Sequence, residues 1–312
     1  MNEVILHHYD ASPFAEKARM MLGFKGLAWR SVEIPRIMPK PDLIALTGGY
    51  RRTPVMQVGA DIYCDTAMMA RQLDRIQPLP ALYPEGRESV AASTAHFADQ
   101  VMFQHGVALN FQPHAVAERF RGAPDEVKKA FQADRKKLFE GGSASPLHPA
   151  QALSQWPTLL GRLEQQLADS GTFLLGEEPC VADFAYYHAL WFVRGNRAIA
   201  ELLDPYQQVL SWMDAVAACG HGEATELDAA DAVDIARNST PASLPESTFE
   251  DVNGTSTGQA VAVSAVDYGV DPVSGILVYQ DAEEIVVRRE DERAGEVHVH
   301  FPRYGFRISP EQ

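Results

Sequence analysis

The 312-residue sequence predicts an α/β unit, followed by an all-helical domain and a small β-rich unit. Three observations support this prediction. In residues 1–82, short apolar runs alternate with helical patterns. In residues 87–220, apolar residues recur only with helical spacing, and from residue 259 they alternate with polar residues as in strands. Residues 221–258, between the helical domain and the β-rich unit, are rich in Ala, Asp, Glu, Ser and Thr, which predicts a linker.

The α/β unit is predicted to begin with a strand at 4–8 and a helix at 13–25. Ser12 is a suitable N-cap residue, Pro13 needs no backbone N–H at the first helical position, and Gly26 can end the helix in the left-handed region. Gly59-Ala60 predicts a two-residue hairpin turn. The other predicted elements are a strand at 29–34, a proline-rich loop at 35–41, hairpin strands at 55–58 and 61–64, and a helix at 66–77.

The remaining parts follow from periodicity and turn residues. Helices are predicted at 87–111, 125–140, 154–170, 182–194 and 205–219, and one in the linker at 225–237, where Thr225 and Asp228 have capping-box-like spacing. Strands are predicted at 260–266, 275–279, 284–289, 296–301 and 304–308. A unit spanning only 259–312 is small for an independent core, so we expect an antiparallel sheet or barrel that leans on the helical domain.

The composition limits the classes of function. A net charge of −15 argues against nucleic acid or an anionic membrane as the main partner, and no apolar run approaches a membrane span. The start of the chain lacks the features of a signal peptide. The three cysteines, Cys64, Cys180 and Cys219, show no metal-binding or CxxC spacing. We therefore expect a cytoplasmic protein without a bound metal.

Polar residues in the α/β unit mark a site for an anion or a thiolate. Ser12 places a hydroxyl at a helix N-terminus, where free N–H groups and the helix dipole favour negative charge. Thr53-Pro54 stands before the first hairpin strand, where a proline marks a special backbone position at which a cis peptide bond can form. Asp65-Thr66 caps the next helix and offers acceptors and N–H groups to a ligand that carries both charges.

The motifs at Ser12, Thr53-Pro54 and Asp65-Thr66 occur along the chain in the same order as similar motifs of cytosolic glutathione transferases, which this sequence resembles. Residues 1–82 resemble their thioredoxin-like domain, and the helical part to about 219 resembles their second domain. Ser12-Pro13-Phe14, with Arg19 seven residues after the serine, is similar to the serine-type pattern. Cys180-Val181-Ala182-Asp183 resembles the capping motif of the second domain, Ser/Thr-x-x-Asp. The resemblance covers about 70% of the chain.

The resemblance implies that glutathione is bound and its thiol activated. Ser12 would donate a hydrogen bond to the sulfur, which increases the thiolate fraction about tenfold for each unit by which the pKa falls. Tyr9, at the end of the first strand, is the alternative catalytic hydroxyl. The implied glutathione-binding residues are Phe14, Lys40, Arg52, Thr53, Pro54, Asp65 and Thr66. For Lys40 and Arg52, expected at the glycyl carboxylate, a role as solvated surface charges is equally consistent with the sequence.

The thiolate would attack a mostly apolar electrophile in a pocket walled by the first long helix and the aromatic run after Asp183. We expect this pocket at Val101, His105, Tyr187 and Trp191, although helical spacing equally suits core packing there. His298 and His300 share one face of a strand, as metal ligands do. No third ligand group is apparent nearby, so a structural or surface pair is expected.

Three features depart from the family pattern. Cys180 replaces the usual capping hydroxyl, Asp65 stands where Glu is more common, and the tail has no counterpart in a two-domain transferase. Two interpretations remain open. The first is a dimeric glutathione transferase, of a family associated with detoxification. The second is a non-catalytic glutathione-binding or interaction protein, whose tail binds a partner or covers the cleft, because a fold does not establish turnover.

Overall fold

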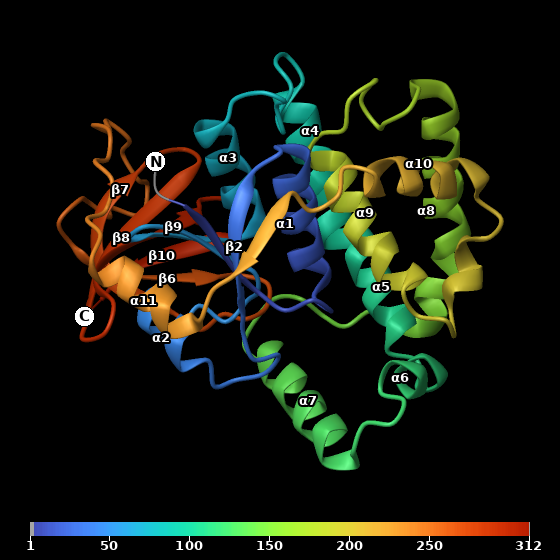
Figure 1. Cartoon of the computed structure of the whole chain (residues 1–312), viewed down its shortest axis with the longest axis horizontal. Coiled ribbons are helices and arrows are strands. Elements are labelled where there is room, and N and C mark those ends of the chain that lie inside the picture. The colour runs from blue at the N-terminus through green and yellow to red at the C-terminus, as the bar shows by residue number, and fades with distance from the viewer. Residues whose placement is uncertain (1–2, 312) are drawn as a thin grey trace.

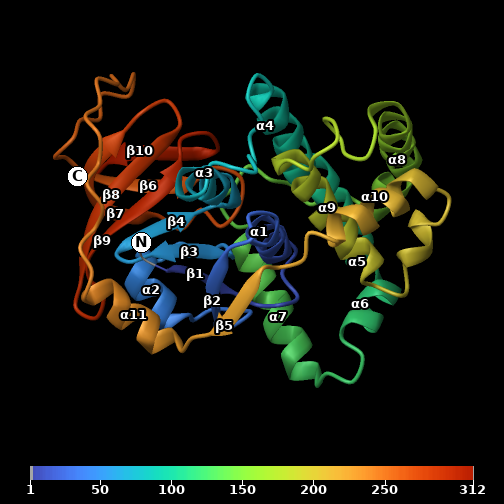
Figure 2. The same ribbon diagram turned by 45° about the horizontal axis from the view of Figure 1, so that its top comes forward.

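The computed structural model describes residues 3–311, with strands gathered on one side and most helices on the other (Figure 1). Helix α1 (Pro13–Phe24) lies between the two sides, against the sheet in one direction and α9 (Val181–Arg194) in the other (Figure 2). The three predicted parts, α/β, all-helical and β-rich, are therefore confirmed. Helix α1 belongs to the first part and packs against the second.

The N-terminal unit has the predicted order, with one additional helix. Strand β1 pairs in parallel with β2 and antiparallel with β3, which forms the hairpin with β4. The additional helix, α2, lies partly in the segment predicted as a proline-rich loop and begins at Pro41, because the first helical position needs no N–H donor. Besides α1, the elements are β1 (Val4–His8), β2 (Ala28–Glu33), α2 (Pro41–Thr47), β3 (Val55–Val58), β4 (Asp61–Cys64) and α3 (Thr66–Ile76).

The helical domain contains all the predicted helices and one more, α6. The predicted helix at 87–111 is interrupted by a π-helical turn, Ala98–Met102, which holds an extra residue and shifts the faces of the helix that follows. None of the described helices is long and apolar enough to cross a bilayer. Besides α9, the elements are α4 (Glu88–Phe97), α5 (Phe103–Asn110), α6 (Pro113–Arg119), α7 (Asp125–Leu138), α8 (Pro149–Ser170), a 3₁₀ turn (Ala200–Leu203) and α10 (Gln207–Ala217).

The tail begins differently from the prediction. Residues predicted as the start of a helix form strand β5, so Thr225 does not cap that helix, which starts after Asp228. The free edge of β2 explains the difference, because it offers hydrogen-bonding partners to this segment. The tail elements are β5 (Glu223–Glu226), α11 (Ala229–Arg237), β6 (Ala260–Ala265), β7 (Val273–Gln280), β8 (Glu284–Asp291), β9 (Gly295–Pro302) and β10 (Phe306–Pro310).

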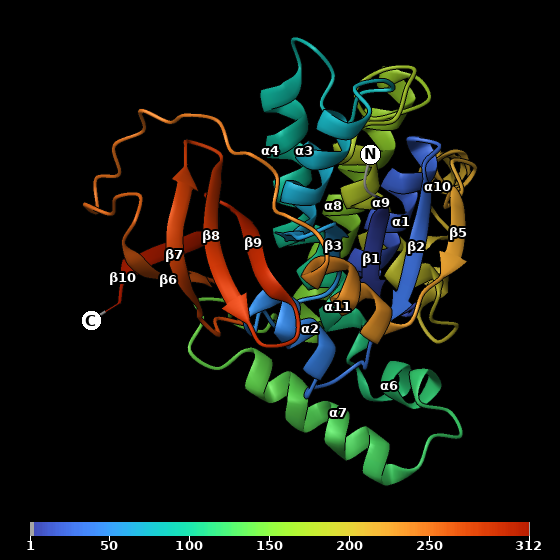
Figure 3. The same ribbon diagram turned by 60° about the vertical axis from the view of Figure 1, so that its left-hand side comes forward.

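All ten strands form one sheet, in the order β10-β6-β7-β8-β9-β4-β3-β1-β2-β5. Strands β6 to β10, seen side by side in Figure 3, are antiparallel to one another, as expected. Strand β9 also pairs in parallel with β4. The tail shares a buried core with the N-terminal unit, in which Ile62 and Tyr50 accompany Val287 and Phe301. The expectation that the tail leans mainly on the helical domain is therefore wrong, because the open edge of β4 supplies a partner that periodicity does not reveal.

A buried ion network fixes α1 against the helical domain. Lys17 Nζ lies 2.6 Å from Asp99 Oδ2, and Asp99 Oδ1 lies 2.9 Å from Nε2 of His188 on α9. Lys17 is 1% exposed. These buried charges are paired with one another, and the pairs join α1 to the helical domain. The N-terminus of α1 therefore has a defined position relative to the cleft between the domains.

The capping motif of α9 is centred on Asp183. Its Oδ2 accepts from the backbone N–H of Cys180 at 2.9 Å, and its Oδ1 accepts from the N–H of Leu174 at 2.9 Å and from Nε1 of Trp212 at 2.8 Å. The Cys180 thiol lies 3.4 Å from the same carboxylate. Asp183 is fully buried. One side chain therefore joins the start of α9, the preceding turn and α10.

Candidate active site

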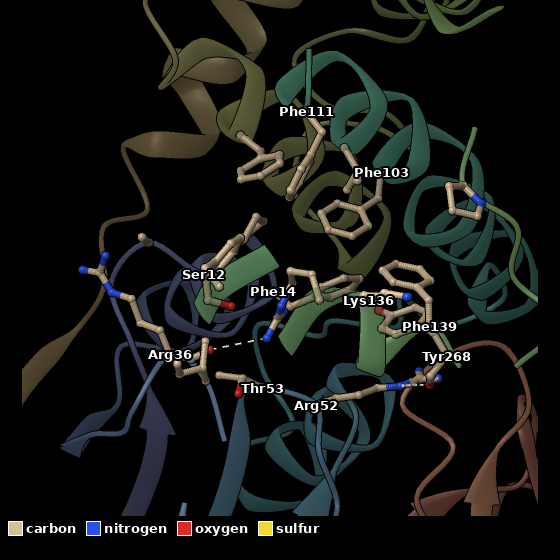
Figure 4. A pocket seen from close by; sticks show the side chains of 18 of the residues that line it. Ser12, Phe14, Arg36, Arg52, Thr53, Phe103, Phe111, Lys136, Phe139 and Tyr268 are labelled. Atoms are coloured by element: carbon tan, nitrogen blue, oxygen red, sulfur yellow. Dashed lines mark hydrogen bonds between the residues drawn. The ribbon is translucent and has the colours of Figure 1, made fainter. Parts of the chain in front are cut away.

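A cavity of about 1160 Å³, here called the main cavity, lies between the N-terminal unit and the helical domain. Figure 4 shows Ser12, Arg36 and Thr53 on one side, with Phe103 and Phe111 opposite them. Although the chain has a net charge of −15, the described residues that line this cavity include seven basic and two acidic side chains. They are Arg36, Lys40, Arg51, Arg52, Arg119, Arg135 and Lys136, against Asp99 and Glu126. The cavity thus favours an anionic ligand.

Ser12 stands where β1 turns into α1. Its Oγ accepts a hydrogen bond from the N–H of Ala15 at 3.2 Å, as an N-cap side chain does. Among the described residues, no acceptor for its hydroxyl proton is present, so this proton can be donated to a ligand in the main cavity. Arg19 stabilises this turn. Its guanidinium donates a hydrogen bond to the carbonyl of Asp10 at 3.0 Å and forms an ion pair with Glu16 at 2.6 Å.

The alternative hydroxyl, that of Tyr9, lines the same cavity. The ring of Tyr9 also packs on the core cluster beneath the sheet. Nζ of Lys40 lies 5.9 Å from the ring centroid. The structure thus brings both candidate hydroxyls to one cavity.

The Thr53–Pro54 bond is cis, as predicted. Thr53 lines the main cavity, and its Oγ1 accepts a hydrogen bond from Lys40 Nζ at 2.8 Å. Burial, together with the nearby guanidinium of Arg135, lowers the pKa of Lys40 to about 8. A carboxylate bound beside Thr53 would therefore contact an ammonium group that loses its proton within an accessible pH range.

Asp65 caps α3 and has a backbone φ of 77°, an unusual value for a residue with a side chain. Its Oδ1 accepts from the N–H of Ala67 at 2.9 Å. Burial raises the pKa of Asp65, and the nearby Arg52 opposes this effect. Asp65 and Thr66 line a second space of about 570 Å³, here called the inner chamber. Thr53 and Phe14 line both spaces, so one extended ligand can reach from one to the other.

Arg52 is buried between the N-terminal unit and the tail. Its guanidinium pairs with the carboxylate of Asp267 and donates to the carbonyl of Tyr268, with Nε at 3.0 Å from that oxygen. Its Nη1 lies 3.8 Å from Asp65 Oδ2, and its guanidinium carbon stacks on the Tyr268 ring at 4.1 Å (Figure 4). The sequence does not reveal that this arginine is already bound by the tail.

The residues expected to wall the electrophile pocket do not line the main cavity or the inner chamber. His105 is buried, with Nδ1 bonded to the Val101 carbonyl and Nε2 to Gln155. Tyr187 is buried and Trp191 partly buried in the helical core. The side chains of this stretch that line the main cavity are Gln100, in the π-helical turn, and Gln104, in α5, each one residue before a predicted position.

Phenylalanine side chains that were not among the predicted pocket residues form the wall of the main cavity, although Phe103, Phe111 and Phe192 lie on the first long helix and the aromatic run that were expected there. They come from α5, α7 and α9 and from the loops between helices. A signal for them was available in α7, where apolar residues are few and Phe131 and Phe139 are eight residues apart, close to two helical turns. Near them, Arg119 stacks on the Phe192 ring at 4.1 Å, and its buried Nε has no hydrogen-bond partner within the part of the chain that the structure describes. The wall residues are Phe103, Phe111, Phe120, Phe131, Phe139 and Phe192.

Asp61 joins His298 and His300 on one face of the sheet, because β4 and β9 are paired. Asp61 Oδ1 lies 3.0 Å from His300 Nε2 and 3.9 Å from His298 Nδ1, so the three groups are close enough to hold a metal ion. The expectation that no third group lies nearby is therefore wrong. Glu284 contacts His300 Nδ1 at 2.7 Å. Although burial opposes it, this pair of carboxylates raises the pKa of His300, and an imidazolium between them also accounts for the cluster.

The cysteines do not supply a nucleophile to the cleft. None of the three lines the main cavity or the inner chamber. Burial raises the pKa of Cys64 well above its usual range and that of Cys180 to about 12. Burial also raises the pKa of Cys219. At neutral pH all three are thiols, so a reactive sulfur in this cleft has to come from a ligand.

A four-stranded α/β unit with a cis-proline and a helix-capping serine, followed by a helical domain that closes a cleft over it, defines a glutathione transferase-like protein. The family models for the N-terminal and C-terminal domains of glutathione S-transferase match residues 6–81 and 130–215. A solved structure described as a GST-like protein from Pseudomonas syringae is 50% identical, with a TM-score of 0.82, over 98% of this chain and 99% of that chain. The chain belongs to the glutathione transferase superfamily.

More distant solved structures share the fold over about 70% of this chain. A glutathione S-transferase from Rhodospirillum rubrum F11 is 17% identical, with a TM-score of 0.51, over 69% of this chain and 87% of its own. Poplar glutathione transferase F1 is 13% identical, with a TM-score of 0.51, over 70% and 93%. The alignment with the Pseudomonas syringae protein, in contrast, includes the tail. A search of curated proteins found no match.

Proposed function

We propose that the protein is a glutathione transferase that activates the glutathione thiol for attack on an apolar electrophile. The main supporting observation is the position of Ser12, which presents a hydroxyl with a free proton and a helix N-terminus to a basic cavity. A thiolate bound there would accept the hydroxyl hydrogen bond and be stabilised by the helix dipole. Tyr9 is the alternative donor.

Glutathione would lie across both spaces. Its γ-glutamyl end would occupy the inner chamber at Asp65 and Thr66, and its cysteinyl part would pair with the backbone beside Pro54. Its glycyl carboxylate would contact Lys40, while Phe14 would pack on the peptide where the two spaces meet. In this arrangement the sulfur faces the phenylalanine wall, which suits an apolar co-substrate. The proposal includes homodimer formation, as the resemblance implies.

The proposal is tested by calorimetric titration of the full chain with glutathione, followed by conjugation assays with aromatic and alkyl electrophiles. We expect saturable binding and a rate that depends on the enzyme. Absence of binding at millimolar glutathione would rule the proposal out. Binding without turnover across the electrophile panel would instead support the second interpretation, a non-catalytic glutathione-binding protein.

The low pKa of Lys40 gives a pH-dependent prediction. Lys40 is cationic below pH 8 and neutral above it, so the contact with the glycyl carboxylate is present at pH 7 and lost as the pH rises. For S-methylglutathione, which has no thiol to titrate, the dissociation constant should rise toward about tenfold per pH unit above pH 8. Calorimetry between pH 6.5 and 9.5 measures it.

The matched control is Lys40→Arg, because a guanidinium stays charged throughout this range. The ligand's own amino group titrates equally in both proteins, so the difference between the two pH profiles isolates Lys40. Parallel profiles for wild type and Lys40→Arg would show that Lys40 does not contact the ligand carboxylate.

A further inference from the structure

The tail inserts one loop into the cleft between the first two domains. Residues 266–269, here called the cleft loop, connect β6 to β7 and meet the end of α7 and the segment after it. The N–H of Ser143 donates to the carbonyl of Val266 at 3.0 Å, that of Ala144 to Asp267 at 2.9 Å, and that of Gly269 to Leu138 at 2.6 Å. These three backbone hydrogen bonds fix the cleft loop to the helical domain.

Glycines on both sides make this approach possible. A Cβ on Gly142 would lie 1.8 Å from the Asp267 carbonyl oxygen, which no side chain tolerates. Gly269 has a φ of 57°, and a Cβ there would lie 3.1 Å from Leu138 Cδ1. The contact between the cleft loop and the helical domain is therefore close-packed, and it holds Asp267 and Tyr268 in defined positions.

The side chains of Asp267 and Tyr268 lie where the main cavity and the inner chamber meet. Tyr268 lines both spaces, whereas Asp267 lines the inner chamber alone. Arg52 connects the cleft loop to the opposite wall, since it pairs with Asp267 on one side and lies 3.8 Å from the Asp65 carboxylate on the other. Two carboxylates, one from the N-terminal unit and one from the tail, therefore share one guanidinium at the inner chamber.

The charges of the inner chamber leave a place for one cation. Among the described residues, its lining carries four acidic side chains, Asp65, Asp99, Asp267 and Glu283, and three lysine or arginine side chains, Lys17, Arg52 and Arg71. Lys17 pairs with Asp99 at 2.6 Å and Arg71 with Glu283 at 2.6 Å. The remaining cation, Arg52, is shared between two carboxylates, those of Asp65 and Asp267. These three side chains together therefore carry one negative charge in excess. An ammonium group would balance it.

We propose that Asp267 of the tail, together with Asp65, binds the α-ammonium group of the γ-glutamyl residue. This inference rests on the proposed function, since it takes glutathione as the ligand. Besides Arg52, Asp267 Oδ2 accepts from Gln100 Nε2 at 3.3 Å and Asp65 Oδ1 accepts from the N–H of Ala67 at 2.9 Å. A carboxylate has about four acceptor positions, so each of the two keeps positions for a further donor. The tail thereby supplies a binding residue to the site from the same chain. The site would then select thiol peptides with a free α-amino group over N-acylated ones.

The test compares two ligands, S-methylglutathione and its N-acetyl derivative, which lacks the ammonium group. Loss of one hydrogen bond to a charged group predicts that Asp267→Asn weakens S-methylglutathione about 10- to 100-fold. The same substitution should leave the already weak N-acetyl ligand within about twofold. Asp271→Asn, an exposed position that follows the cleft loop, is the matched control and should bind both ligands as wild type does.

The outcomes separate the inference from the function on which it rests. If wild type fails to bind S-methylglutathione, the proposed function is wrong. If wild type binds and Asp267→Asn binds equally well, only the role of Asp267 is wrong. Equal weakening of both ligands would assign Asp267 a structural role through Arg52 and overturn the inference. If Asp267→Asn does not fold, Asp267→Glu should keep the preference for the free amine, and loss of that preference would also contradict the inference.

Discussion

Replacing Ser12 with Ala is expected to abolish the thiolate signal of bound glutathione at neutral pH and to lower the conjugation rate about 100-fold. A hydrogen bond to a charged group contributes about 1.5–3 kcal/mol, which corresponds to a 10- to 100-fold change in the thiolate fraction. The free hydroxyl proton of Ser12 in the main cavity is the structural basis of this expectation. Ultraviolet absorbance of the bound thiolate against pH, with steady-state kinetics, measures both effects.

Two variants make this result interpretable. Ser12→Thr keeps a hydroxyl and a capping group, so it should retain most of the activity, and it controls for the loss of the N-cap, which costs about 1 kcal/mol. Tyr9→Phe removes the competing hydroxyl. If the thiolate survives in Ser12→Ala and disappears in Tyr9→Phe, the donor is Tyr9. A thiolate that survives in both variants would refute hydroxyl activation altogether.

Replacing Asp183 with Ala is expected to have the largest effect on stability of any single substitution considered for this chain. Three buried donors, the N–H groups of Leu174 and Cys180 and Nε1 of Trp212, would lose their acceptor. Each unsatisfied buried donor costs about 1–3 kcal/mol, so the free energy of unfolding should fall by roughly 3–9 kcal/mol. This is a large part of the 5–15 kcal/mol typical of a folded domain.

Urea denaturation followed by tryptophan fluorescence measures this loss, because Trp212 contacts the carboxylate directly. Asp183→Asn is the graded control, since its amide oxygen can still accept two of the three hydrogen bonds and about half of the loss should be recovered. Asp204→Ala, an exposed position in the same domain, should leave the midpoint unchanged. A midpoint for Asp183→Ala within experimental error of wild type would show that water or a shifted backbone satisfies these donors.

The sequence predicts the N-terminal unit well because its signals are local. The cap at Ser12, the turn at Gly59-Ala60 and the proline after Thr53 each act over a few residues, and the structure contains the helix, the hairpin and the cis bond that they indicate. Helix α2 was missed because prolines suggest a loop until one of them is found at the first helical position. Strand positions in the tail were likewise predictable from alternation.

The pairing of those strands was not predictable from one sequence. Strand β9 adds to β4 across more than 200 positions of chain, and alternation shows which face of a strand is buried without naming its partner. The same separation concealed the approach of Asp267 to Arg52 and of Asp61 to His300. In the helical domain a π-helical turn interrupts the first long helix, and the side chains that line the main cavity there are Gln100 and Gln104, next to the predicted Val101 and His105.

The position of the tail on both edges of the N-terminal sheet has a consequence for biosynthesis. Strand β5 covers the β2 edge and β9 the β4 edge, and both follow the whole helical domain in the chain. About 230 residues separate β4 from β9, so at roughly 5–20 residues per second a ribosome needs roughly 10–50 s to complete the second cover. During that interval the nascent chain exposes unpaired strand edges, which are sites for intermolecular association. Chaperones that bind nascent polypeptides would protect this protein until its last strands emerge.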